Sequence, residues 1–127
     1  QARLGWATEV ADVTGDGTAD LLLGAAHLSM SGNCAAGGTC DFSWGRGAIY
    51  GLYSSTVWSA RSPLVSLGQD DAFDFRFDGA GTADGADYTI EVGDLNNDHK
   101  PDIVFGSRAG DTQGRVDNGV AYVVFGG

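Results

Sequence analysis

The chain has 127 residues, of which 43% are hydrophobic, and a formal net charge of −10 at pH 7 from 17 acidic and 7 basic residues. This length and apolar content predict one packed domain, residues 1–127, rather than a disordered tail. Nucleic-acid binding needs a basic surface, and Lys100 is the only lysine, so the composition excludes that class of partner. No apolar run reaches the roughly 18 residues that a bilayer requires, so the sequence predicts no membrane span.

The predicted secondary structure is a series of short strands. The chain contains 21 glycines, and glycine scattered among short apolar runs is typical of many turns. No long segment has the 3.6-residue apolar period of an amphipathic helix. In chain order we expect strands at about 6–11, 20–25, 47–54, 73–77, 87–93, 102–107 and 119–125.

An acidic loop joins the first two predicted strands. Numbered from its first aspartate, the loop has oxygen-bearing side chains at positions 1, 3, 5 and 9, which are Asp12, Thr14, Asp16 and Asp20. Thr18, at position 7, can offer its backbone carbonyl. Calcium takes six to eight oxygen ligands at about 2.3–2.6 Å, whereas magnesium demands a smaller and stricter octahedron. The loop therefore predicts a calcium site, with magnesium as the second choice.

The segment after the second predicted strand carries both cysteines. Cys34 and Cys40 are too far apart for a CxxC redox motif, and no second cysteine pair completes a zinc site. We predict a disulfide that closes a small loop, which favours an oxidising, extracellular or cell-surface location; two unrelated reduced thiols are the alternative. Residues 27–46 also form a candidate ligand-binding loop, in which Trp44 is the best candidate for an exposed aromatic residue.

A second acidic loop repeats the first at an offset of 82 residues (94 − 12). Residues 92–107 align without gaps on residues 10–25, and three aspartates, a valine and a glycine are identical. The equivalent ligands are Asp94, Asn96, Asp98 and Asp102, with the carbonyl of Lys100 at position 7. A second block repeats at an offset of 72 residues (119 − 47), since residues 47–53 resemble residues 119–125. The chain thus contains two units, at about 6–79 and 87–127, and we expect it to bind two calcium ions.

The loops differ from an EF-hand, which needs a glutamate at position 12 and flanking helices. Position 12 is Leu23 in the first loop and Phe105 in the second, and both lie in strand-like apolar runs. At position 6, Gly17 suits a left-handed turn, and His99 replaces it in the second loop. The alternative is a pair of Asx-rich turns with no metal, but two copies between strands favour calcium.

Together, the acidic loop, the apolar run with Gly24-Ala25 and the sequences Gly47-Ala48-Ile49-Tyr50 and Gly119-Val120-Ala121-Tyr122 resemble the FG-GAP repeat. The resemblance covers residues 6–55 and 87–127. It implies four-stranded antiparallel blades like those of integrin α-subunit propellers, with calcium in the loop between the first two strands. We therefore expect an all-β fold of two propeller-type blades, the second lacking its fourth strand. Family propellers usually have seven blades, so a closed propeller from this chain alone is excluded.

No arrangement of serine, histidine, aspartate or cysteine indicates a nucleophile, so we expect no enzymatic activity. The main hypothesis is a calcium-binding structural or adhesive module. The alternatives are a lectin-like or protein-binding module that uses residues 27–46, and a fragment of a larger propeller receptor or enzyme.

We expect the chain to associate with other copies of itself. Residues 120–125 form an apolar strand that would have an open edge if the second blade lacks its fourth strand, and open edges pair with other chains. We expect residues 1–4 of a neighbouring copy to complete the blade by strand addition, in a ring or a filament.

The predicted disulfide is tested by thiol labelling. Labelling of the denatured, unreduced protein should find no free thiol, because Cys34 and Cys40 are joined. Reduction should cost less than the usual ~2–4 kcal/mol, since the closed ring is short, and it should leave calcium binding intact. Two reactive thiols before reduction would contradict the prediction.

Overall fold

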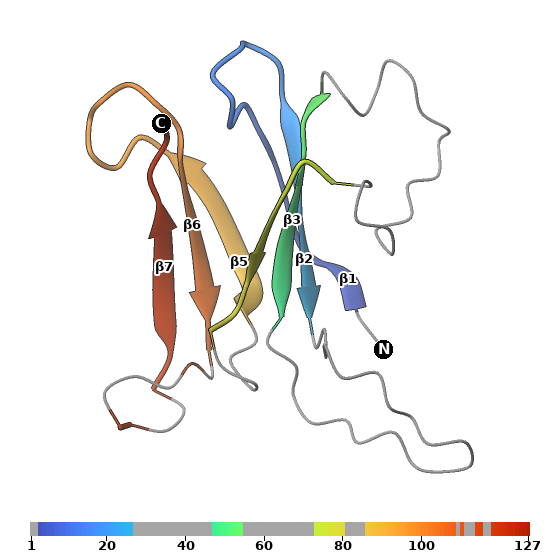
Figure 1. The fold of residues 1–127 in the computed structure, drawn as a ribbon, viewed down its shortest axis with the longest axis vertical. Helices are drawn as coiled ribbons and strands as arrows, with labels where there is room; N and C mark the ends of the chain where they lie inside the picture. The colour runs from blue at the N-terminus through green and yellow to red at the C-terminus, as the bar shows by residue number, and fades with distance from the viewer. Residues whose placement is uncertain are drawn as a thin grey trace.

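The computed structural model describes residues 3–26, 47–54, 73–80, 86–108, 110, 114–115 and 118–127. Within these ranges, seven strands form two open antiparallel sheets of four and three strands (Figure 1). The predicted all-β class is confirmed, and the described strands close into neither a barrel nor a propeller. No helix in this part of the chain is long and apolar enough to cross a membrane. The predicted disulfide and the 27–46 loop lie outside the described residues.

The first sheet has the strand order β1-β2-β3-β4. These strands are β1 (Arg3–Ala11), β2 (Asp20–Ala26), β3 (Ala48–Leu52) and β4 (Phe75–Asp78). All four lie where the sequence predicts strands.

Strand β1 begins earlier than expected. Arg3 and Leu4 pair with Ala26 and Ala25 of β2, and the register shifts between Leu4 and Thr8. The shift coincides with Gly5, whose φ of 84° suits a glycine at a bulge. The expectation that residues 1–4 stand outside the sheet is therefore wrong for Arg3 and Leu4. Donating these two residues to a neighbouring copy would cost the pairing that they already make.

The second sheet has the strand order β5-β6-β7. Its strands are β5 (Ala86–Gly93), β6 (Asp102–Ser107) and β7 (Val120–Val124). The register shift of β1 recurs in β5, between Ala86 and Thr89, so the two units share this irregularity as well as their strand order. Among the described strands, β7 pairs only with β6, as expected for a unit without a fourth strand.

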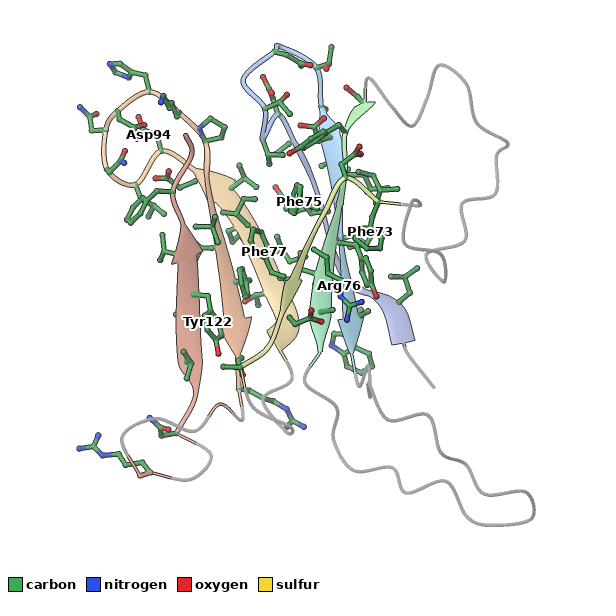
Figure 2. The ribbon with its side chains drawn as sticks, viewed as in Figure 1. Phe73, Phe75, Arg76, Phe77, Asp94 and Tyr122 are labelled. Atoms are coloured by element: carbon green, nitrogen blue, oxygen red, sulfur yellow. The ribbon has the colours of Figure 1, made fainter. Side chains whose placement is uncertain are left out.

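The two sheets pack face to face, and we call the meeting faces inner and the opposite faces outer. Strand β5 lies against β1 and β2 of the first sheet. The buried residues between the sheets are Leu22, Ile49, Ile90, Ile103 and Phe105. A row of aromatic rings also joins the sheets: Phe77 stacks on Phe105 with ring centroids 5.8 Å apart, and Phe105 stacks on Tyr122 at 5.0 Å (Figure 2). Burial of these rings stabilises the contact between the two sheets.

The outer face of the first sheet is buried around β3. A second cluster contains Ala25, Ala48, Tyr50 and Leu52, and Phe73 meets the Tyr50 ring edge-on at 5.1 Å. Strand β3 is therefore buried on both faces, which explains its almost wholly apolar sequence.

Close packing between β3 and β4 predicts that Gly51 tolerates no side chain. The Phe75 ring lies over this residue, and a Cβ atom placed there would come within 2.0 Å of it. We expect Gly51→Ala to cost about 1–3 kcal/mol, as overpacked cores usually do, measured by urea unfolding. The control is Gly93→Ala, also in a strand, where nothing lies within 4 Å of the new Cβ. Equal losses in both variants would contradict this account.

Candidate metal centre

The two acidic loops lie at the same end of the molecule, where β1 turns into β2 and β5 turns into β6 (Figure 1). Each loop connects two antiparallel strands, so its first and ninth positions are held at the ends of neighbouring strands. The expected strand–loop–strand context is present in both units.

The backbone takes the same unusual conformation in both loops. At position 4 the φ angle is 76° for Gly15 and 62° for Asn97, and at position 6 it is 86° for Gly17 and 68° for His99. Left-handed conformations at alternate positions turn the chain tightly. Asparagine and histidine tolerate positive φ better than most non-glycine residues. The second loop therefore keeps the geometry of the first without its glycines.

The aspartate at position 1 organises the turn. Asp12 accepts hydrogen bonds from the backbone N–H groups of positions 5 and 6, at 3.2 and 2.8 Å. Asp94 accepts the same two bonds, at 3.1 and 2.9 Å (Figure 2). Each carboxylate thus faces the inside of its own loop.

The aspartate at position 5 is exposed and keeps its charge. The hydroxyl of Thr18 is the main cause that lowers the pKa of Asp16, and the side-chain amide of Asn96 is the main cause that lowers the pKa of Asp98. In each loop the backbone N–H of position 7 also donates to this carboxylate, at 2.8 Å. Hydrogen bonds to the charged form favour ionisation. Both groups are therefore anionic well below neutral pH.

The aspartate at position 9 is buried, with 1% of Asp20 and none of Asp102 exposed. In each loop its Oδ2 atom accepts the backbone N–H of position 2, at 3.0 Å in the first loop and 2.8 Å in the second. A buried carboxylate is costly unless it is hydrogen-bonded. These bonds offset that cost and close the loop across its ends.

The same buried carboxylates also bind the segment just after the third strand of each sheet. The backbone N–H of Ser54 donates to Asp20 Oδ1 and that of Gly126 to Asp102 Oδ1, both at 2.9 Å. The sequence analysis missed these two residues. They could have been found, because 126 − 54 equals the offset of 72 that relates the third strands. Position 9 thus joins the loop to the segment after β3 in one unit and after β7 in the other.

The donor set fits calcium in its chemistry. Each loop offers three carboxylates, a neutral side-chain oxygen at position 3 and the carbonyl at position 7, and calcium accepts oxygens of all these kinds. A carboxylate has about four acceptor sites. Asp12 accepts four hydrogen bonds, from the Thr14 hydroxyl and the backbone N–H groups of positions 4, 5 and 6, so a cation there would replace some of these bonds. Asp94 accepts the N–H groups of positions 5 and 6 and keeps acceptor sites for a cation. However, no three acidic, histidine or cysteine side chains among the described residues gather closely enough to hold a metal ion. The loops supply suitable ligands that are not drawn together.

Comparison with known protein families supports the repeat predicted for the second unit. Residues 86–124, which include the whole second loop, match the model of the FG-GAP repeat. The chain contains an FG-GAP repeat. FG-GAP repeats often bind calcium and form blade modules of β-propellers. No match to the chain was found among curated proteins.

The first loop allows a direct test of its electrostatics. In Thr18→Val the hydroxyl donor to Asp16 is lost, so the pKa of the Asp16 carboxyl should rise toward its usual value of 3.8. The measurement is a carboxyl NMR titration in EGTA, with Asp98 of the second loop as the internal control. Because the native pKa is lowered, Asp16 stabilises the fold above pH 3.8, and this contribution is lost as the pH falls through the native pKa. An unchanged Asp16 titration would contradict the assigned cause.

Proposed function

We propose that the chain is a calcium-binding, blade-like structural module with one ion in each acidic loop. The ligands in the first loop would be the side chains of positions 1, 3, 5 and 9 and the carbonyl of Thr18. In the second loop they would be the equivalent side chains and the carbonyl of Lys100. The proposal covers both loops because the two units share one geometry.

The observation that carries the proposal is the equivalence of the loops despite their different sequences. Positions 3, 4, 6 and 7 all differ between the loops, yet the left-handed residues coincide. Both loops also share the bonds to position 1 from positions 5 and 6, to position 5 from position 7, and to position 9 from position 2. What the two sequences share is the trio of carboxylates at positions 1, 5 and 9.

Calcium would have a structural role in this module. Three carboxylates in a nine-residue loop repel one another, and a bound cation supplies the charge that offsets this repulsion. The position 9 carboxylate is hydrogen-bonded to the second residue after the third strand. Stabilising the loop would therefore also stabilise the attachment of that strand.

A structural or adhesive role at the cell surface or outside the cell is the function we favour over an enzymatic one. Support comes from the blade-like sheets, the FG-GAP match and the pair of cysteines in the sequence. A glycan or protein ligand of the 27–46 loop remains a second hypothesis, which a glycan array would test.

Calcium binding is measured by thermal unfolding and titration calorimetry. A ligand that binds only the native state stabilises it by about 2.7 kcal/mol per site at 100 times its Kd. EGTA should therefore lower the Tm markedly, and calcium, but not equimolar magnesium, should restore it. Asp16→Ala and Asp98→Ala should each reduce the stoichiometry from two ions to one.

The matched control is Glu91→Ala, which removes an exposed acid from β5 outside both loops. This variant should still bind two ions. Identical melting curves in EGTA and in calcium, with no heat of binding, would refute the proposed function.

A further inference from the structure

Among the residues that the structure describes, the exposed large apolar side chains are concentrated on two outer faces. The large hydrophobic residues that stand out are Leu4, Trp6, Val10, Leu95, Val123 and Phe125, which are 46–65% exposed. Leu95 belongs to the second acidic loop. The other five lie on β1 of the first sheet or at β7 of the second, at opposite sides of the pair of sheets.

On the first sheet the exposed residues belong to the outer face. Val10 pairs with Leu21, and Leu4 with Ala25, and both partners belong to the outer cluster or pack against it. Cross-strand partners share a face of a sheet. The part of the outer face around β3 is buried, so the free part is the one along β1.

On the second sheet the exposed residues also face outward. Tyr122 and Val124 pack against the inter-sheet core, and side chains alternate along a strand. Val123, and Phe125 just after β7, therefore point to the outer face, where Val123 is 46% exposed and Phe125 61%.

The repeat indicates that these two outer faces are complementary, as the two inner faces are. Val10 is equivalent to Val92 (10 + 82), which packs into the contact between the sheets.

On the outer face of the second sheet, Val104 is equivalent to Leu22 (22 + 82) and Phe125 to Tyr53 (53 + 72). Leu22 is fully buried in the contact between the sheets, and the Tyr53 and Phe75 rings lie together, with centroids 5.7 Å apart. The outer face at β1 thus has the character of the second sheet's inner face, and the outer face of the second sheet has the character of the first sheet's inner face.

We propose that the chain binds a second copy of itself head to tail, with the outer face at β1 of one copy packed on the outer β5-β6-β7 face of the next. The contact repeats the one inside each chain, where β5 lies on β1 and β2. In the contact between copies, β1 of one chain takes the place of β5. The exposed outer face of β1 is therefore the face that the contact requires.

This contact differs from strand addition at the β7 edge. It uses side chains rather than the unpaired backbone of an edge, and it leaves Arg3 and Leu4 paired in β1. Because the two faces differ, the interface is heterologous and either closes into a ring or continues as a filament. It does not depend on the metal, so calcium binding and association are measured independently.

The test is the native mass of the chain in calcium, by light scattering, for the wild type and two variants. Val10→Glu places a charge on the first face and Val123→Glu on the second; both positions are exposed, so the fold should persist, as circular dichroism would verify. We expect concentration-dependent association of the wild type and a monomer for each variant. Arg115→Glu, which also introduces a glutamate at an exposed position but in the segment between β6 and β7, should associate like the wild type.

Mixing the two variants separates this interface from other modes of association. Each variant keeps one intact face, so an equimolar mixture should form a dimer containing one copy of each and grow no further. A wild type that stays monomeric up to its solubility limit would overturn the proposal. So would association that survives either variant, or a mixture that stays monomeric, either of which would point to the β7 edge or another surface.

Discussion

The buried carboxylate at position 9 connects the parts of each unit. Asp20 and Asp102 are the first residues of the second strand in their units. Each accepts a hydrogen bond from the start of its acidic loop and another from the second residue after the third strand. Leaving a buried acceptor without its hydrogen bonds costs about 1–3 kcal/mol, and more when the acceptor is charged. One side chain thus joins the acidic loop, the second strand that carries the side chain, and the segment after the third strand.

This arrangement relates the acidic loops to the stability of the sheets. Val13 of the first loop packs against the core, but most residues of both loops are exposed and their charges are alike. Their conformation comes from hydrogen bonds between carboxylates and backbone N–H groups, together with left-handed residues at positions 4 and 6. A cation would strengthen the same framework, because it offsets the repulsion among the carboxylates that accept these bonds.

The contact between the sheets follows from the difference between the two faces of each unit. Aromatic residues from β4, β6 and β7 stack in one row across the gap, and Phe75 covers Gly51 of β3. In the second unit the residue equivalent to Gly51 is Val123 (51 + 72), which is exposed on β7, a strand that pairs only with β6 among the described strands. The two units therefore share a loop and a strand order, while their outer faces present different surfaces.

The sequence by itself determined the local features of this protein. Alternating oxygens in two aligned loops predicted the candidate ligands, and the short apolar runs predicted all seven strands, because both signals depend on residues close together in the chain. The start of β1 was missed, since the pairing of Arg3 and Leu4 depends on a bulge at Gly5. Only the tertiary structure revealed the hydrogen bonds from Ser54 and Gly126 and the packing of β5 on the first sheet. Which face of a strand is covered depends on residues far away in sequence, and Val10 and Val92, identical in type and in repeat position, have opposite environments for that reason.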